Sequence, residues 1–465
     1  MRAAVTVGAL GASVGLEAWT LYLGAPWTGG ARLLLFAYAV GWLLFALAVL
    51  ALPRLPPRRL IALILGGAAA LQVVAMCFVP TTTDDYYRYV WDGTVQAHGI
   101  DPYRYAPLDP ALKPLRDPWL FPTGAAAAQL VEASPAKGWI DACTYLGIPH
   151  DCTRINRPTV HTLYPPVAEA AFVGLHRVSP HGLRRQFVQL FAGLLAWSTS
   201  AALVAVLWRA GRDVRAAAWW AWCPMVWLEC GNNAHIDVLG ILLLVATFGV
   251  LAGSPSKARV ATAGGLFGAA VAVKLLPALV APAFLGRRPN KRWLLLFGCA
   301  GAVFLVGYLP HVVAVGTDVI GYLPGYLREE GYSGQERFGV LRLAVPRTWT
   351  AVLAAVLLAI AVLIVRRDAG RRSLAQRALF LAGTAFVLVG PSQPWYGLLI
   401  VALVALSDRP EWLAVAAAAY PVYLSGALGV DNSVMQQRSY LPAACFVLLV
   451  SMIRRPIFRR AVSIR

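Results

Sequence analysis

Long apolar runs, separated by short basic segments, recur along this chain and constrain its fold more than any other feature. A run of about 20 apolar residues crosses the ~30 Å hydrocarbon core of a bilayer as one α-helix. Backbone polar groups in lipid must be satisfied within the segment itself, which favours helices for such runs. We therefore predict an all-α polytopic membrane protein, a bundle of about 12 to 14 transmembrane helices, in which residues 1–465 form a single membrane domain.

Two of the predicted spans are short and join at Lys274-Leu275-Leu276-Pro277, so a broken or re-entrant hairpin explains them as well as two full crossings do. The predicted spans are residues 4–23, 31–52, 60–79, 186–208, 216–231, 236–252, 260–272, 275–285, 293–311, 348–365, 378–391, 395–406, 412–428 and 440–453.

Basic residues gather in the short connections, which places these connections in the cytoplasm. Both termini are then cytoplasmic, and we expect a multi-pass protein of a bacterial plasma membrane. The formal net charge of +19 is explained by this orientation and by attraction to anionic lipid. We therefore expect the lipid bilayer as a partner and no nucleic acid.

Residues 80–185 form the longest predicted external loop, and residues 312–347 form a second one. All seven histidines and most acidic residues fall on the long loop or at predicted outer helix ends. Because ionisable groups are costly within a bilayer, this distribution indicates chemistry at the outer boundary, although polar loops alone would also produce it. Cys143 and Cys152 lie together in the long loop, where a disulfide between them is permitted.

Four segments combine residue types that can carry chemistry. Residues 84–98 are expected to begin as a helix on which Asp85, Arg88 and Asp92 share a face. Residues 229–237 place amide, imidazole and carboxylate groups between two apolar spans. Lys274 lies so deep that it needs a partner or an anionic ligand. Residues 391–396 end on an aromatic pair that could also serve as an interface anchor.

These groups suit transfer from a lipid-phosphate-linked donor. The cytoplasmic segments contain no nucleotide-binding motif and are too short for a nucleotide-binding domain. A carboxylate can take the proton of an acceptor hydroxyl, and arginine or lysine can stabilise the charge that grows on a leaving phosphate. Tryptophan and tyrosine offer flat surfaces for sugar rings and prenyl chains.

A series of motifs in order along residues 84–396 resembles the GT-C glycosyltransferase superfamily, and most of all its bacterial polyprenyl-phosphate-mannose-dependent α-mannosyltransferases. The motifs are Asp-Tyr-Tyr-Arg-Tyr-Val-Trp-Asp-Gly at 85–93, Asn-Arg-Pro at 156–158, Tyr-Pro-Pro at 164–166, residues 232–237, Lys-Leu-Leu-Pro at 274–277 and Pro-Trp-Tyr at 394–396. The resemblance implies a polyprenyl-phosphate sugar donor, with mannose the first candidate, and an acceptor that is a cell-envelope glycan or glycolipid. It also implies an inverting single displacement.

The resemblance further implies an acidic general base just after an early span. Asp85 matches this base, with Asp84 as its neighbour, because Asp85 stands two residues before the Tyr-Arg-Tyr run. The alternative is that Asp85 is a helix N-cap, a role that Asp84 or Thr83 could equally fill. By the same resemblance, the candidates for contacts with the donor are Arg88, Asp92, Tyr164, Asn232, His235, Asp237, Lys274, Trp395 and Tyr396.

This sequence also departs from the family pattern. Arg157 stands where relatives often have histidine, Ile236 stands where asparagine is common, and residues 119–154 resemble an insertion. We expect no cofactor besides the lipid-linked donor, since no histidine, cysteine or carboxylate group has recognised metal-ligand spacing, although a hard cation could bind carboxylates with help from phosphate. The rival functions are a lipid-linked-sugar transporter or flippase and a non-catalytic receptor-like membrane protein.

Overall fold

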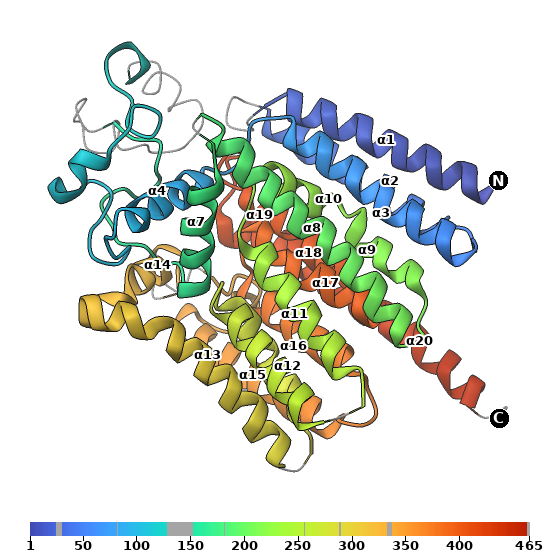
Figure 1. The fold of residues 1–465 in the computed structure, drawn as a ribbon. Coiled ribbons are helices and arrows are strands. Elements are labelled where there is room, and N and C mark those ends of the chain that lie inside the picture. Colours follow the sequence, from blue (N-terminus) through green and yellow to red (C-terminus); the bar gives the residue numbers. More distant parts are fainter. Residues whose placement is uncertain are drawn as a thin grey trace. The chain divides into compact units, whose positions relative to one another are not determined.

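The computed structural model describes residues 1–24, 30–80, 82–127, 152–180, 182–254, 256–287, 290–332 and 337–462. Within these ranges the regular structure is helical, and no β-strand forms. The helices, drawn in Figure 1, gather into two compact units. The first unit is Met1–Pro277 with Asn290–Glu329, and the second is Ala278–Pro289 with Glu330–Arg465. The single membrane domain expected for residues 1–465 stays a prediction.

The predicted all-α polytopic membrane protein is confirmed. Six helical segments of the described ranges are long and apolar enough to cross a membrane. They are Arg2–Tyr22 (α1), Ala31–Leu50 (α2), Pro57–Met76 (α3), Arg184–Arg209 (α8), Lys291–Glu329, which begins with α13 (Lys291–Val315), and Arg347–Arg367, which contains α15 (Thr350–Arg367). Three shorter apolar segments match further predicted spans: Asp237–Leu251 (α11), Leu374–Val389 (α16) and Pro394–Ser407, which contains α17 (Leu398–Ser407). The number of 12 to 14 crossings stays a prediction.

Small residues allow the closest helix contact of the first unit. In this unit α1 packs on α2, α8 packs on α3 and α11, and α12 (Lys257–Val271) packs on α11 and α13. A Cβ atom added to Gly264 or Gly268 of α12 would lie 2.3 Å from the carbonyl oxygen of Leu296 or Ala300 in α13. The two glycines are four residues apart and thus occupy one face of α12. They let the two backbones approach, as small residues commonly do in membrane helix pairs.

Several of the predicted spans are broken into short helices, among them 412–428, which contains α18 (Leu413–Ala417) and α19 (Ala419–Tyr423). The predicted continuous span 216–231 instead consists of a 3₁₀ turn (Val214–Ala217), α9 (Ala218–Ala221), α10 (Pro224–Val226) and a π-helix (Trp227–Asn232). Pro224 lacks a backbone N–H and its ring clashes with a helix that approaches from before it, so the helix restarts there. At the predicted junction near Lys274, α12 ends at Val271 and a 3₁₀ helix occupies Leu276–Phe284, in agreement with the broken alternative.

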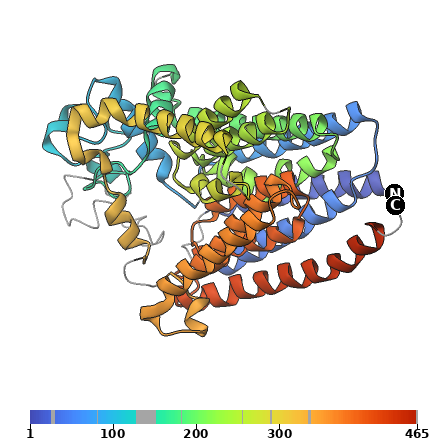
Figure 2. The ribbon, with the colours of Figure 1, turned by 90° about the horizontal axis from the view of Figure 1, so that it is seen from below.

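The long external connection contains two amphipathic helices, α4 (Asp85–Ala97) and α7 (Pro166–Val178), and a short 3₁₀ helix at Pro110–Leu115. The helix predicted for residues 84–98 is thereby confirmed. The helices α4 and α7 pack against each other and both contact α8. Figures 1 and 2 place them at the end of the first unit opposite Met1.

The second unit is built around a helix that is enclosed on every side. All residues of α17, from Leu398 to Ser407, are buried. Around it lie α16, α18 (Leu413–Ala417) and the 3₁₀ turns that flank α17. A side-chain capping box of Ser373 and Gln376 begins α16. The last helix, α20 (Asn432–Val462), is the long rod at the C-terminal end of the chain in Figure 2.

Candidate active site

Two neighbouring carboxylates at the start of α4 form the centre of the candidate site. Asp84, and not Asp85, occupies the N-cap position of α4, and Asp85 lies in the first turn. The side-chain amide of Asn156 donates to one oxygen of each carboxylate, at 2.6 Å to Asp84 and 2.8 Å to Asp85. Removal from water, and then the adjacent charge of Asp85, raise the pKa of Asp84 from 3.8 to about 7. Asp84 therefore exchanges a proton near neutral pH, which is typical of functional carboxylates.

Arg88 and Asp92 form a buried ion pair one turn further along α4. The Arg88 Nε donates to both Asp92 oxygens, at 2.9 and 3.1 Å, and both side chains are nearly inaccessible. The Arg88 Nη1 also donates to the carbonyl of Val160, at 3.2 Å. The prediction that Arg88 and Asp92 share one face of the helix is thus confirmed. In this structure the pair holds the segment around residue 160 against α4, which is a positioning role.

Glu169 of α7 extends this buried polar network. The Thr162 hydroxyl donates to Glu169 Oε1 at 2.7 Å, and the Gln96 amide donates to Glu169 Oε2 at 2.7 Å. Burial, and then the charge of Asp92, raise the pKa of Glu169 well above its usual range. The Gln96 contact ties the last turn of α4 to α7, and Glu169 and Thr162 are themselves fully buried.

His235 lies between two carboxylates, one of which is Asp85. The His235 Nδ1 is 3.7 Å from Asp85 Oδ2, and its Nε2 is 3.4 Å from Glu229 Oε2. The Asn233 amide donates to Glu229 Oε2 at 3.0 Å and to the Thr82 hydroxyl at 2.7 Å. Residues 229–237 and residues 82–85, which are about 150 positions apart in the sequence, thus meet in the first unit.

Asn232 supports the backbone at the end of α3. Its side-chain amide donates to three backbone carbonyls, those of Ala75 at 3.1 Å, Phe78 at 3.2 Å and Val79 at 3.2 Å. The amide of Gln189 donates to the Asn232 carbonyl at 2.8 Å. Since Asn232 is fully buried, it holds the chain that leads from α3 to Asp84.

Lys274 forms an ion pair with a carboxylate. Its Nζ lies 3.2 Å from Asp237 Oδ2 and 5.4 Å above the centre of the Tyr164 ring. The Tyr164 ring meets Tyr89 edge-on at 5.2 Å, and Tyr89 stacks on Phe172 at 4.6 Å. Of the two possibilities foreseen for this deep lysine, a partner or an anionic ligand, the structure provides the partner. The Lys274 side chain stays 14% exposed and can still meet a ligand.

Arg157 occupies an unusual backbone position in the same unit. Its φ of 47° lies in the left-handed region, which few residues other than glycine adopt. Its Nε donates to Glu329 Oε2 at 2.6 Å, and its guanidinium lies 5.6 Å from the centre of the Tyr326 ring. Residue 157, which departs from the family pattern, therefore joins the long external loop to α14 (Leu323–Glu329).

The predicted aromatic pair belongs to the second unit. The rings of Trp395 and Tyr396 meet at 6.0 Å and 78°, and Trp395 is buried against Tyr423, with ring centres 5.8 Å apart. Arg337 holds the segment before this pair, donating to the Ser392 hydroxyl at 2.8 Å. Arg337 also contacts Gln393 and forms an ion pair with Glu330.

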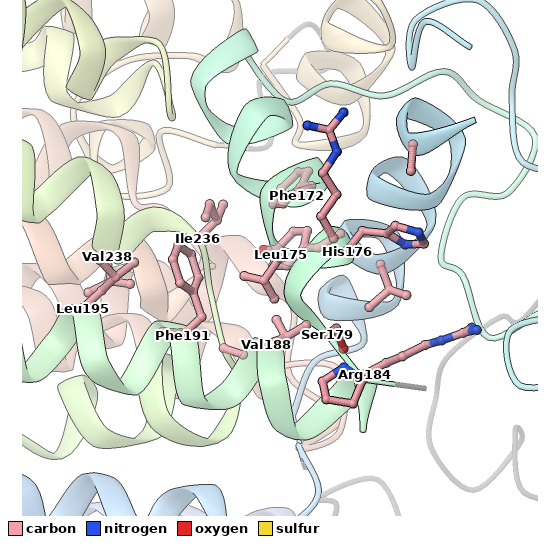
Figure 3. A pocket seen from close by; sticks show the side chains of 17 residues that line it. Phe172, Leu175, His176, Ser179, Arg184, Val188, Phe191, Leu195, Ile236 and Val238 are labelled. Atoms are coloured by element: carbon pink, nitrogen blue, oxygen red, sulfur yellow. The ribbon is translucent and has the colours of Figure 1, made fainter. Parts of the chain in front are cut away.

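A largely apolar cavity of about 370 Å³ lies next to the carboxylate site in the first unit. Figure 3 shows Phe172, Leu175, Val188 and Phe191 lining it, with Arg184 at its edge. The other lining residues are Tyr89, Val90, Ala97, His176, Arg177, Ser179, Pro180, Ala192, Leu195, Ala234, Ile236 and Val238. Tyr89, Ala234 and Ile236 are neighbours in sequence of the site residues, so the cavity adjoins the site.

The described cysteines occur both as thiols and in a disulfide. Cys77, Cys223, Cys230, Cys299 and Cys445 are thiols, and Cys152 is disulfide-bonded. Cys143, the partner predicted for Cys152, lies outside the described residues. The described ranges contain no group of three or more histidine, cysteine or acidic side chains arranged to hold a metal ion.

The site also includes residues that the sequence alone did not single out as functional. Asn156 and Glu229 lie in segments that were recognised as motifs, but neither residue was assigned a role. Glu169 and Thr162 carried no signal, because a buried acid in an apolar helix is identified only by its contacts.

The fold and the site together define a polytopic membrane protein with a partly exposed carboxylate pair on a buried polar base. Residues 162–391, just under half of the chain, match the family model described as glycosyltransferase family 87. This match supports a glycosyltransferase of a GT-C-like family, and the long apolar helices support a membrane protein. No curated protein and no solved structure matches the chain.

Proposed function

We propose that this glycosyltransferase moves a sugar, with mannose as the first candidate, from a polyprenyl-phosphate donor to a glycan or glycolipid acceptor of the bacterial cell envelope. The observation that carries the proposal is the position of Asp85. Its side chain is 16% exposed, whereas the carboxylates of Asp92, Glu229 and Asp237 are 5% exposed or less. With its neighbour Asp84, Asp85 is thus a carboxylate that an acceptor hydroxyl can reach.

The reaction is a single displacement at the anomeric carbon. Asp85 takes the proton of the acceptor hydroxyl while that oxygen forms a bond to the anomeric carbon. The bond between the anomeric carbon and the donor phosphate breaks, and polyprenyl phosphate leaves with the electron pair. Attack from the face opposite the phosphate inverts the anomeric configuration. Lys274, partly exposed and 3.2 Å from Asp237, is the candidate that stabilises the leaving phosphate.

The apolar cavity supports a lipid-linked substrate. Its volume of about 370 Å³ and its lining of Phe172, Leu175, Val188 and Phe191 suit a segment of isoprenoid or acyl chain. Arg177 and Arg184 also line the cavity, and their charge suits a phosphate at the end of such a chain. Arg184 lies 2.6 Å from Asp117, so a phosphate there would compete with this carboxylate.

The proposed location is the plasma membrane, with both termini cytoplasmic and the site on the outer face. In the first unit, α4 and α7 lie at the end opposite Met1, in agreement with a site across the membrane from the N-terminus. The basic connections support the same orientation.

The test is sugar transfer from labelled polyprenyl-phosphate mannose by the purified protein in lipid. We compare the wild type with Asp85→Asn and with the control Asp109→Asn, which retains a side-chain oxygen to cap the 3₁₀ helix Pro110–Leu115. Loss of general-base catalysis should lower the rate of Asp85→Asn by at least ~100-fold, with the control unchanged. Equal rates in wild type and Asp85→Asn would move the base to the neighbouring Asp84. Donor binding without transfer to any of a broad panel of acceptors would favour a flippase.

A further inference from the structure

A buried histidine links the reachable carboxylate of the site to a second carboxylate in the interior. His235 is fully buried and its two ring nitrogens face different acids, Asp85 at 3.7 Å and Glu229 at 3.4 Å. Both separations are longer than hydrogen bonds, as is common for catalytic contacts before a substrate is bound. A fully buried histidine between two acids is well placed to accept a proton.

The backbone around His235 is irregular, and this irregularity positions both the His235 ring and the Glu229 side chain. Glu229 lies in the π-helix Trp227–Asn232, a rare element that is frequent at functional sites. Ala234 has a φ of 58°, in the left-handed region that a residue with a side chain seldom adopts. The amide of His235 then donates to the Glu229 carbonyl at 2.9 Å. A regular helix would not turn the His235 ring and the Glu229 side chain toward each other in this way.

Neutral side chains hold Glu229, the interior acid of this group, in place. Glu229 accepts from the Asn233 amide at 3.0 Å, and Asn233 also donates to the Thr82 hydroxyl at 2.7 Å. The Glu229 side chain is 2% exposed. The charged groups near the outer acid are Asp84 and Arg157, and Asp237 and Lys274 form a pair of their own.

We propose that Asp85, His235 and Glu229 form a proton relay for the glycosyl transfer, an inference that rests on the proposed function. When the acceptor O–H bond breaks, its proton binds an Asp85 oxygen. That O–H bond then breaks in turn, its electron pair stays on the carboxylate, and the proton binds His235 Nδ1. The resulting imidazolium lies between the carboxylates of Asp85 and Glu229, which stabilise it. After the products leave, the proton returns through Asp85 to water.

His235 and Glu229 are positioning residues in this scheme, because Asp85 alone touches the acceptor. Their contribution is to keep Asp85 ionised while the new bond forms. A merely structural histidine would support the fold and affect donor binding and turnover together. The relay instead predicts an effect on turnover that disappears when Asp85 is already absent, since residues that act as one unit are non-additive.

The experiment measures kcat and the donor KM for the wild type, His235→Gln, Glu229→Gln, Asp85→Asn and the double variant Asp85→Asn/His235→Gln. The matched control is His98→Gln, an exposed histidine at the other end of α4. We expect His235→Gln and Glu229→Gln to lower kcat by about 10- to 100-fold with the donor KM unchanged. The double variant should be no slower than Asp85→Asn, and His98→Gln should match the wild type.

Other results would overturn the relay. Wild-type kcat in both His235→Gln and Glu229→Gln, while Asp85→Asn is inactive, refutes the relay and leaves the proposed function standing. A double variant slowed by the product of the two single effects shows that His235 acts independently of Asp85, with the same consequence. If thermal unfolding shows that His235→Gln does not fold, the same kcat comparison is made with Glu229→Gln and with the double variant Asp85→Asn/Glu229→Gln. These two variants then test the relay. A wild type that transfers no sugar overturns both proposals.

Discussion

The raised pKa of Asp84 predicts that replacing this residue stabilises the protein, and does so more at higher pH. An acid whose pKa is higher in the folded state than in the unfolded state binds more protons when folded between the two values. Stability is therefore lost as pH rises from 3.8 to about 7, the values for Asp84. Asp84→Asn removes this titration and keeps a side chain of similar size whose oxygen can still accept from Asn156.

The magnitude follows from the two pKa values. Between pH 5 and pH 8 the wild type should lose roughly 2–3 kcal/mol of unfolding free energy relative to Asp84→Asn. The assay is unfolding of both proteins in the same detergent at the two pH values, followed by tryptophan fluorescence. Titrating groups that do not interact with Asp84 contribute equally to both proteins and cancel in the comparison. Parallel pH dependences for wild type and Asp84→Asn would refute the reasoning, since Asp84 would then titrate alike in both states.

Three further predictions concern the site, the fold and the metal requirement. Asn156→Ala removes the donor shared by Asp84 and Asp85, and kcat should fall about 10- to 100-fold at unchanged folding; a wild-type kcat would contradict this positioning role. Gly268→Val places side-chain atoms against the α13 backbone and should cost about 1–3 kcal/mol or more in thermal unfolding. Gly265→Ala is the control, since its added Cβ would meet Val303 at an ordinary 3.8 Å; equal losses would argue against close α12–α13 packing. Transfer should persist in EDTA, because lysine and arginine can neutralise the donor's single phosphate, and complete loss restored by Mg²⁺ or Mn²⁺ would overturn this.

The contacts of the predicted donor-binding residues divide them into two kinds. Lys274 and Tyr164 remain close to each other beside the apolar cavity, which suits contact with a lipid-linked donor. Arg88, Asp92 and Asn232 are instead enclosed by protein partners, so their substitution should first affect the geometry of Asp85. These three residues are thus placed to hold the site in position.

Local sequence was sufficient for the features that depend on neighbours along the chain. Apolar runs near 20 residues predicted the helices at 2–22, 31–50 and 57–76 within a few residues, because the bilayer sets the length of a spanning helix. The spacing of Arg88 and Asp92 predicted their shared helix face, since residues four apart are adjacent on a helix. Proline and the apolar pattern also marked the break after Lys274, although the break at Pro224 was not predicted.

The tertiary structure alone decided which polar residues meet. Asn156 reaches Asp84 and Asp85 across more than 70 positions, and Glu229 reaches His235 through a π-helix, which the sequence did not indicate. Such contacts depend on how α4, α7 and α8 pack, and packing is set by side-chain shape over the whole unit. Hydrophobic periodicity by itself determined an all-α membrane protein with polar residues at its helix ends. The carboxylate pair, its amide donor and the buried histidine became one site only through the three-dimensional arrangement of helices, because burial removes water and forces each polar group to find a partner in the protein.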